Sequence, residues 1–484
     1  MKNVTADIAI IAAGPAGLAA AIAAAESGGS VVVFEKSPVT GGTGNMGMGP
    51  LGLGTKIQKE AMIDIDVEKA FDQFMEHTHW RVDGRLVKKY FEKSADTIEW
   101  LQEMGVEFFG AAKYFPGSEA SWHIVKPESG RPGPRAASAM YKKMTERAIE
   151  LGVDFHLESP AFKILKEGDA VCGVMAKNKN GEEIEARTKA VIVATGGFGD
   201  NVDWIKKYCG LTWGQEIFSF RIPGLMGDGI RMAWEIGAGD TEVGMEIIFQ
   251  MPHTTDNAPL IGRIFSQPNL LVNRDGERFI NEAVMENVTY CGNAILRQRD
   301  RTAFSIIDSA IVKHYKRHGL DVLSLVHPHM EVGDFEGEFE ESLKSGNPDI
   351  KKADTLEELA EKCGLDQEAF LATVEQYNED CAGRDTVFGK PDRFMKPIGK
   401  APFYAGQFFP SAYGTLGGIK VNHNLEVLTK DHQKIKGFYG AGTDVCTIYG
   451  DSYVFTLPGN TMGFALNSGR MAGENAMDYL NSLD

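Results

Sequence analysis

The first forty residues alternate between short apolar runs and one long alanine-rich stretch. Residues 7–13, DIAIIAA, are almost continuously apolar, which predicts a buried strand. After the turn GPAG, the stretch LAAAIAAAESG favours a helix that ends at Gly28-Gly29. A second apolar run, SVVVFEKS, predicts another buried strand. Together these segments predict a βαβ unit and therefore an α/β fold.

The turn inside this unit carries the clearest chemical signal. It follows the GxGxxG pattern with alanine in the first glycine's place: Ala12, Ala13, Gly14, Pro15, Ala16 and Gly17. Small residues here let a pyrophosphate approach the helix N-terminus, where free N–H groups attract negative charge. We expect alanine to replace the first glycine if its backbone angles are ordinary. Glu35 ends the second strand, where it is placed to accept ribose hydroxyls. The pattern predicts a Rossmann-like dinucleotide-binding domain, with a plain βαβ unit as the alternative.

A glycine-rich segment after Glu35 favours flavin over nicotinamide. It reads KSPVTGGTGNMGMGPLGLG, which is too rich in glycine to form a core. Such backbone can lie flat against a large planar cofactor, so we expect FAD.

Two later segments also have clear patterns. Residues 354–380, DTLEELAEKCGLDQEAFLATVEQYNED, predict two amphipathic helices divided at Gly364, the first capped by Thr355 with Glu358 three residues later. Residues 449–463, YGDSYVFTLPGNTMG, combine aromatic residues, proline and glycines just before a final long helix that opens at Gly459-Asn460-Thr461. We expect the two amphipathic helices to be scaffold.

Composition and charge narrow the functional classes. The chain has 484 residues, 43% of them hydrophobic, and a net charge of −17 without basic clusters, so nucleic acid is not an expected partner. Its six cysteines form no CxxC pair, which predicts reduced thiols and no metal site. The uncharged residues 8–25 are explained by the strand, turn and helix rather than by a membrane span, so the expected location is the cytoplasm.

Ordered segments along nearly the whole chain resemble the flavoprotein family of fumarate reductase and succinate dehydrogenase. They include AVIVATGGFGDN (190–201), MGDGIRMAWEIGA (226–238), LLVNRDGERFINE (270–282) and GGIKVNHNLEVLTKDHQKIKGFYGAGTD (417–444). The resemblance implies a discontinuous FAD-binding domain, residues 1–249 and 414–484, with an inserted α+β capping domain, residues 250–413. The histidine that links FAD covalently in succinate dehydrogenase is missing from GGTGNMGMG, so we expect noncovalent FAD.

The fingerprint and the resemblance together predict the cofactor-binding residues. Thr443 and Asp444 stand where the family usually has a glutamate that holds the ribityl chain. The N-terminus of the last helix is expected to point at the flavin's pyrimidine edge. Besides the turn, the set comprises Glu35, Lys36, Ser37, Gly41, Gly42, Thr43, Gly47, Met48, Ala161, Ala194, Thr195, Gly196, Asp228, Gly442, Thr443, Asp444, Asn460 and Thr461.

The substrate positions depart from the family. The family's HPT becomes MPHTT, which displaces His253 by one residue, and its HTMGG histidine falls on Gly414. The arginine that acts as acid falls on Glu286, and the arginine before the last helix is absent. Because a dicarboxylate would lose its charged hydrogen bonds, we expect fumarate and succinate to be poor substrates.

Aromatic and hydroxylic residues replace that cationic set. We predict Tyr453, Tyr449, Glu286 and His253 as catalytic candidates, and Tyr413 and Phe455 as substrate-binding residues. The alternative for the tyrosines is packing beneath the flavin, and for Glu286 an ordinary exposed position. Ketosteroid dehydrogenases of the same superfamily are similar, with a tyrosine just before this helix.

We therefore expect an FAD-dependent reductase that transfers hydride to a bulky, uncharged, oxygenated substrate: an enone, a steroid, or an isoflavonoid or other polyphenol of the tetrahydrodaidzein type. Flavoproteins of anaerobic gut bacteria that reduce isoflavonoids are similar in size. The alternatives are a ketosteroid-type dehydrogenase working oxidatively and a flavoprotein subunit of an electron-transfer complex. Without a second GxGxxG unit, we expect a separate electron donor, either a reductase or reduced flavin or NAD(P)H.

Overall fold

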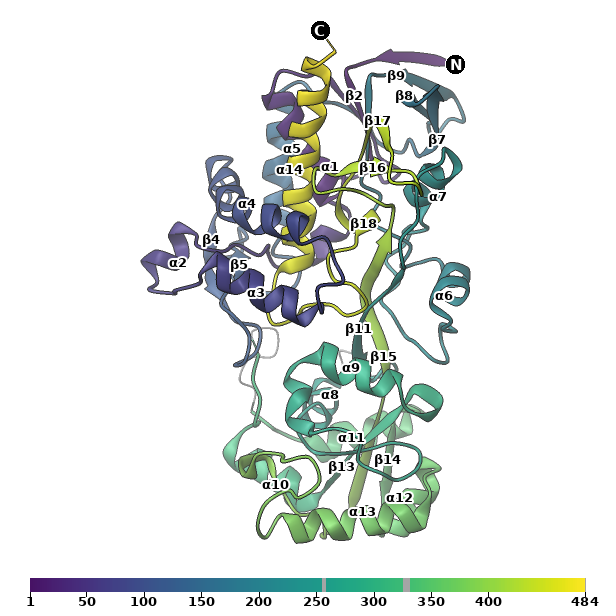
Figure 1. Cartoon of the computed structure of the whole chain (residues 1–484). Coiled ribbons are helices and arrows are strands. Elements are labelled where there is room, and N and C mark those ends of the chain that lie inside the picture. Colours follow the sequence, from purple (N-terminus) through teal and green to yellow (C-terminus); the bar gives the residue numbers. More distant parts are fainter. Residues whose placement is uncertain (255–257, 325–330, 484) are drawn as a thin grey trace.

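The computed structural model describes residues 1–254, 258–324 and 331–483, which form an upper and a lower part, each built on its own sheet (Figure 1). Within these residues, the upper sheet has the strand order β1-β9-β8-β17-β10-β2-β3-β6, with β16 and β7 paired at its side. Its strands are β1 (Lys2–Thr5), β2 (Ile8–Ile11), β3 (Val31–Phe34), β6 (Asp154–His156), β7 (Ala161–Glu167), β8 (Ala170–Lys177), β9 (Glu183–Arg187), β10 (Ala190–Val193), β16 (Glu426–Leu428) and β17 (Lys434–Gly440).

The predicted βαβ unit is confirmed at the centre of this sheet. β2 pairs in parallel with β3 and with β10, and all four residues of each strand are buried. Helix α1 (Pro15–Glu26) connects β2 to β3 and is buried along most of its length. Because the carboxyl ends of parallel strands share one edge, the turns after β2, β3 and β10 meet there.

The last helix, α14 (Asn460–Asn481), packs against α1 in the middle of the upper part (Figure 1). The two backbones approach so closely that only glycine fits at the contact. A Cβ on Gly469 would lie 2.2 Å from Ala16 O, and one on Gly473 would lie 2.5 Å from Ala20 O. The two helices therefore run parallel, and because Gly469 is the tenth residue of α14, the N-terminus of α14 extends roughly 14 Å beyond this contact with the start of α1.

The lower part is built on a second sheet with the order β11-β15-β13-β12, to which β14 and β18 also pair. The long strand β15 runs between the two parts in Figure 1. Strands β4 (Phe108–Ala112) and β5 (Trp122–Val125) form a separate hairpin. The strands of the second sheet are β11 (Gly244–Gln250), β12 (Leu270–Val272), β13 (Ala303–Asp308), β14 (Ile350–Ala353), β15 (Phe403–Gly418) and β18 (Val445–Cys446).

The remaining helices cover these sheets. The predicted pair is confirmed as α12 (Leu356–Cys363) and α13 (Gln367–Asp380), with Thr355 Oγ1 accepting the Glu358 N–H at 3.1 Å. The others are α2 (Lys56–Glu60), α3 (Val67–His77), α4 (Gly84–Glu103), α5 (Ser138–Glu150), α6 (Val202–Cys209), α7 (Asp228–Glu235), α8 (Pro259–Phe265), α9 (Val288–Leu296), α10 (Ser309–His318) and α11 (Phe335–Lys344).

The two parts have separate hydrophobic cores. The upper core takes Met245 and Ile247 from β11 and Ala412 and Leu416 from β15, whereas the lower core takes residues 249–408 from the middle of the chain. This division supports the predicted domain limits, which stay a prediction. Both limits fall inside β11 or β15, so the connection is a pair of antiparallel strands rather than two loops.

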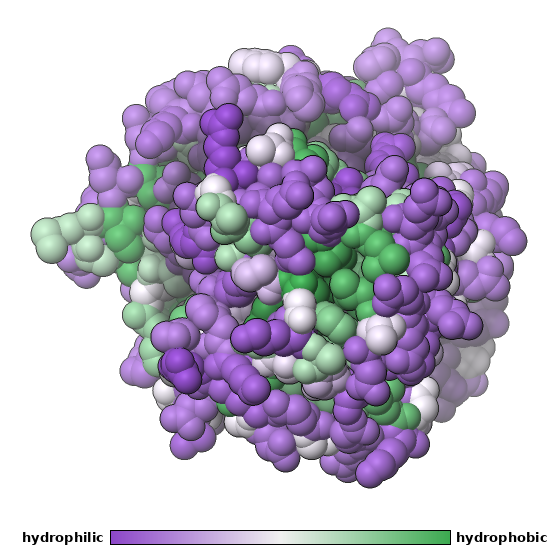
Figure 2. Space-filling view, turned by 90° about the horizontal axis from the view of Figure 1, so that it is seen from below, coloured by the Kyte–Doolittle hydropathy of each residue, from purple (hydrophilic) through white to green (hydrophobic). Residues whose placement is uncertain are grey.

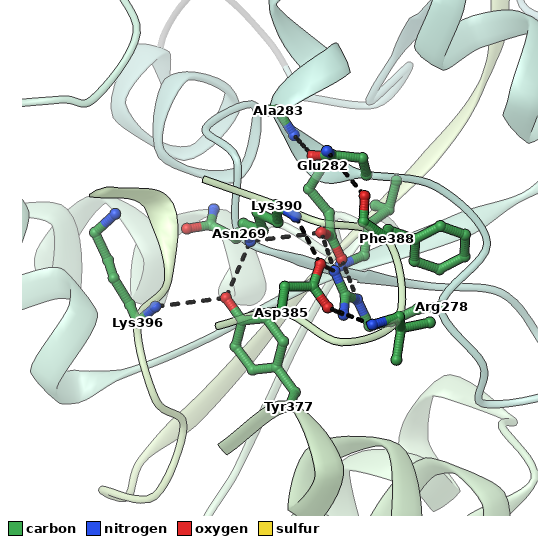
Figure 3. A network of polar contacts seen from close by, with 12 residues as sticks. Asn269, Arg278, Glu282, Ala283, Tyr377, Asp385, Phe388, Lys390 and Lys396 are labelled. Atoms are coloured by element: carbon green, nitrogen blue, oxygen red, sulfur yellow. Dashed lines mark hydrogen bonds and ion pairs between the residues drawn. The ribbon is translucent and has the colours of Figure 1, made fainter. Parts of the chain in front are cut away.

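A buried charge network ties the lower part together (Figure 3). The Arg278 guanidinium donates to both carboxylate oxygens of Glu282 (2.9 and 2.7 Å) and of Asp385 (2.8 and 2.9 Å). Lys390 Nζ lies 3.6 Å from Glu282 and donates to Tyr377 Oη at 3.0 Å. Two cations thus neutralise two carboxylates in the lower part.

Seen from the lower end, the molecule is mostly hydrophilic, with a hydrophobic area near the centre of the face (Figure 2).

Candidate active site

The turn after β2 has the shape that a pyrophosphate site needs. A Cβ on Gly17 would lie 2.0 Å from Ala12 O, whereas one on Gly14 would meet nothing within 4 Å. The replacement of the first glycine by alanine is expected to be easy only with ordinary backbone angles, and Ala12 does not have them, because its φ is +82°. The turn requires a left-handed residue at this point, and alanine adopts that conformation at a cost in strain.

Glu35 organises the loops around this turn. Its side chain accepts the Ala13 N–H and the Ser37 N–H, both at 2.7 Å. The Ser159 N–H donates to the Glu35 carbonyl at 2.8 Å, which brings the start of β7, and with it Ala161, to the same edge. The ribose contact of Glu35 stays a prediction.

Lys36 and Asp228, both predicted at the cofactor, form an ion pair of 3.1 Å beside this edge. Lys36 also donates to the Gly224 carbonyl. Asp228 is the first residue of α7, which follows Gly227 at φ +81°. The pair therefore joins the end of β3 to a helix N-terminus.

The glycine-rich segment lies directly against the phosphate turn. The Gly41 N–H donates to Ala13 O at 2.8 Å, and a Cβ on Gly42 would lie 3.2 Å from Gly14 Cα. Thr43 belongs to the short helix η1 (Gly42–Met46), which Gly47 ends and the buried Met48 follows. The segment thus forms one wall of the predicted cofactor site.

The opposite wall is held by a buried carboxylate. Asp444, at the end of η5 (Gly442–Asp444), accepts the Gly197 N–H at 2.8 Å, the Thr195 hydroxyl at 2.8 Å and the Thr195 N–H. Gly196 lies inside this loop at φ +89° and follows the buried Ala194. The Asp444 side chain therefore positions the loop after β10, while Thr443 is only partly buried.

The N-terminus of α14 presents unused donors roughly 14 Å beyond Ala16 of the phosphate turn, measured along the helix. It begins after Gly459 at φ +84° without a side-chain cap. Asn460 is fully buried and accepts the Tyr90 hydroxyl on Oδ1 at 2.9 Å, but its Nδ2 has no partner among the described residues. An isoalloxazine ring, with carbonyl oxygens on its pyrimidine edge, would satisfy such donors. The residues of this site therefore fit FAD.

Aromatic side chains gather next to the α14 N-terminus. Tyr453 lies 4.9 Å from Tyr449 and 5.8 Å from Phe455, measured between ring centroids. Phe455 stacks on Tyr413 at 6.4 Å, and 41% of Tyr413 is exposed. Tyr449 is fully buried, and its hydroxyl lacks a partner in the described residues, which fits packing better than proton transfer.

The structure adds aromatic residues that the sequence did not reveal. Tyr114 packs edge-on against Phe455 at 4.6 Å and shares a hydrogen bond with Tyr413. Phe115 stacks on Phe455 at 6.2 Å, and the half-exposed Phe220 stacks on Tyr413 at 5.9 Å. These rings come from segments far from residue 449 in the sequence.

A buried glutamate, also missed in the sequence, lies beside these rings. Glu246 on β11 is 1% exposed, and the Thr461 hydroxyl donates to its Oε1 at 3.2 Å. The Thr461 N–H donates to Tyr453 Oη at 3.2 Å, so Thr461 contacts both Glu246 and Tyr453. Burial raises the pKa of Glu246 to about 8. The available signal was one charged residue inside the apolar run GMEIIFQ.

His253 and Glu286, the other two catalytic candidates, form no described contact with Glu246 or the tyrosines beside it. His253 Nδ1 pairs with Asp349 at 2.8 Å in the lower part, beyond the end of β11. Gln250, the last residue of β11, is four positions beyond Glu246, which is roughly 13 Å along the strand. Glu286 ends η2 (Glu282–Glu286), and partial burial raises its pKa. Their catalytic roles stay predictions.

Comparison with known proteins identifies the family. Residues 7–461 match the FAD binding domain family. This chain belongs to that family. It is 32% identical to vinyl phenol reductase of Lactiplantibacillus plantarum over 99% of this chain and 97% of the relative. It is 30% identical to NADH:fumarate oxidoreductase of Klebsiella pneumoniae, over 97% of this chain and 47% of that protein.

Solved structures agree with this assignment. The open conformation of a flavocytochrome c3 fumarate reductase matches with a TM-score of 0.70 and 26% identity, covering 99% of this chain and 79% of that one. A 3-ketosteroid dehydrogenase from Rhodococcus jostii RHA1 matches with a TM-score of 0.76 and 24% identity over 99% and 98%, which shows the shared fold.

These findings confirm the predicted fold, the family resemblance and FAD as cofactor of this oxidoreductase. In the part of the chain that the structure describes, no helix is long and apolar enough to cross a membrane, and no cluster of three metal-binding side chains occurs. The individual cofactor contacts of this FAD-binding family member stay predictions.

Proposed function

We propose that this flavoprotein reduces a conjugated C=C bond in an uncharged, oxygenated and preferably aromatic small molecule. FAD, once bound and reduced, would supply the hydride. The vinyl phenol reductase at 32% identity over nearly the full length of both chains supports a substrate whose double bond is conjugated to a phenol ring. Enones, steroids and isoflavonoids belong to the same chemical class.

The observation that carries the proposal is the lining next to the α14 N-terminus. Tyr413 and Phe220, which are 41% and 44% exposed, offer rings for stacking. The buried ring of Phe455 packs against Tyr413 and is itself packed by Tyr114 and Phe115. In the described residues Glu246 forms no ion pair, so no fixed cation there offsets an anion. A dicarboxylate would meet a buried carboxyl group instead of a guanidinium, which disfavours fumarate.

Tyr453 is the proton donor in this proposal. The Thr461 N–H, in the first turn of α14, donates to Tyr453 Oη and would stabilise the phenolate left after proton transfer, as would the positive end of the helix. The substrate would stack between the aromatic rings while this hydroxyl faces the carbon that takes the proton. A separate reductase, reduced flavin or NAD(P)H would supply electrons.

The test uses purified holoenzyme under anaerobic conditions. The enzyme is reduced with dithionite and mixed separately with 4-vinylphenol, a steroid enone, an isoflavone and fumarate, and flavin reoxidation is followed by absorbance. We expect the uncharged alkenes to reoxidise the flavin and fumarate to do so far more slowly. Rapid reoxidation by fumarate, with none by the other compounds, would refute the proposal.

A variant pair tests Tyr453. Tyr453→Phe should lower the rate of alkene reduction by roughly 10²-fold or more, because a positioned general acid contributes about that much. Tyr208→Phe, which alters a ring packed against Trp204 and Trp234, serves as the matched control and should keep the wild-type rate. Equal rates in both variants would remove Tyr453 from the mechanism.

A further inference from the structure

Glu246 is a buried carboxyl group beside the predicted active site to which the proposed reaction assigns no role. It extends from β11 into the contact between β15 and the α14 N-terminus. A Cβ on Gly414 would lie 3.2 Å from Glu246 Oε2, so any larger residue at 414 would press on this carboxyl group. The absence of a side chain at Gly414 therefore leaves room for the Glu246 carboxyl group.

We propose that Glu246 is the internal proton source of the site and reprotonates Tyr453 through the hydroxyl of Thr461. This inference rests on the proposed reductase function and names the route by which its proton arrives. Thr461 contacts both groups, because its hydroxyl donates to Glu246 Oε1 at 3.2 Å and its N–H donates to Tyr453 Oη at 3.2 Å. The Thr461 side chain also opposes the raised pKa of Tyr453, as expected of a hydroxyl near the phenol oxygen. Thr461 belongs to the first turn of α14, so the packing of that helix on α1 fixes the relay.

The proton balance of the step is complete. Tyr453 gives its proton to the substrate carbon that does not receive hydride, which leaves a phenolate. The Thr461 hydroxyl, which donates to Glu246 in the structure, turns its hydrogen toward the phenolate, passes it on and takes one from the Glu246 carboxylic acid, which leaves a carboxylate. Glu246 regains a proton from solvent between turnovers. The net addition to the alkene is one hydride and one proton, and no further oxidant or reductant enters.

The surroundings keep Glu246 protonated near neutral pH. Burial raises its pKa to about 8, and the hydrogen bond from the Thr461 hydroxyl opposes this shift. Helix α9, packed on β11, contains no charged residue, and α6 exposes its charged side chains. The titratable groups that face the carboxyl group are Tyr413, Tyr449, Tyr453 and Cys446.

Direction of transfer follows from acidity. Burial raises the pKa of Tyr453 above its usual value, so its phenolate is a much stronger base than the Glu246 carboxylate. Proton movement from Glu246 to the phenolate is therefore downhill. Above about pH 8 Glu246 ionises, so it has no proton to pass to Tyr453 at the start of a turnover.

The first experiment compares pH–rate profiles of alkene reduction by pre-reduced holoenzyme. Wild type should lose rate as pH rises through about 8, whereas Glu246→Gln should be slower by roughly 10-fold or more at neutral pH and lack that limb. Thr461→Val should behave like Glu246→Gln, and Thr461→Ser should restore the wild-type profile. Glu338→Gln is the matched control, because partial burial also raises the pKa of Glu338 but it lies on α11 in the cap.

The second experiment does not depend on turnover. Infrared spectra of oxidised holoenzyme should contain a protonated-carboxyl C=O band that is absent from Glu246→Gln and fades with a midpoint near pH 8. The inference is overturned if Glu246→Gln keeps both the wild-type rate and the alkaline limb, or if no band is lost. If wild type reduces none of the alkenes, the proposed function fails, while the infrared titration still decides whether Glu246 is the stored proton.

Discussion

The buried network around Arg278 makes a strong prediction about stability. We consider Arg278→Met, which retains a long unbranched apolar side chain in place of the methylene groups of arginine but removes the guanidinium. Arg278 is 5% exposed at its side chain, and Glu282 and Asp385 are fully buried. Its loss removes four hydrogen bonds of 2.7 to 2.9 Å and leaves two carboxylates with only Lys390 as a cation.

The size of the effect follows from what remains buried. Four charge-assisted hydrogen bonds have a gross worth of roughly 6 to 12 kcal/mol, but the guanidinium no longer pays for its desolvation. Breaking a buried pair from one side costs about 3 to 5 kcal/mol net, which we expect here. Burial lowers the pKa of Lys390 to about 8, and removal of the Arg278 charge should raise that pKa. Wild type should therefore gain more stability than the variant as its Lys390 deprotonates above about pH 8, so the difference in unfolding free energy should be largest at alkaline pH.

The assay is urea unfolding of holoenzyme at neutral pH, combined with hydrogen exchange of the cap. Arg299→Met is the matched control, since Arg299 pairs with Asp275 at 2.7 Å on the surface and such pairs contribute about 0 to 1 kcal/mol. Arg278→Met should speed amide exchange across the cap and leave the sheet around β2 protected. A destabilisation within 1 kcal/mol of the control would contradict the reasoning.

Three other changes give expected outcomes. The pKa of Glu246 is about 8 in the folded protein and 4.5 when the group is unperturbed. Wild type should therefore lose about 1.4 kcal/mol of stability per pH unit between these values, relative to Glu246→Gln. A difference in melting temperature that does not change with pH would contradict this. Ala12→Gly should raise unfolding free energy by about 1 kcal/mol because φ +82° strains alanine, and calorimetry showing a loss would contradict it. Gly469→Ala should release FAD and lower stability by about 1 to 3 kcal/mol, because its Cβ would meet Ala16 O. Gly262→Ala is the matched control, since Gly262 also lies in a helix but has open space for a Cβ; flavin retention, read by fluorescence, should differ between the two variants, and equal retention would contradict the prediction.

Local patterns in the sequence determined the cofactor domain. The apolar runs at residues 7–13 and 30–37, with a small-residue turn and an alanine-rich helix between them, predicted the βαβ unit that the structure contains. These signals survive because each depends on neighbours within about twenty residues, where strand and helix periodicities act directly. The loss of arginines at substrate positions came from the family resemblance rather than from local periodicity, and it stays a prediction.

Tertiary structure decided the chemistry beside the flavin site. Glu246 and Thr461 are 215 residues apart, and no periodicity pairs them. Their contact exists because β11 continues from the cap into the upper part and α14 is pressed onto α1 by glycine contacts. The same holds for Arg278 and Asp385, 107 residues apart, and for the positive φ of Ala12. A side chain's charge state and partners depend on burial by distant segments, so only the folded chain makes the glutamate an acid that holds its proton.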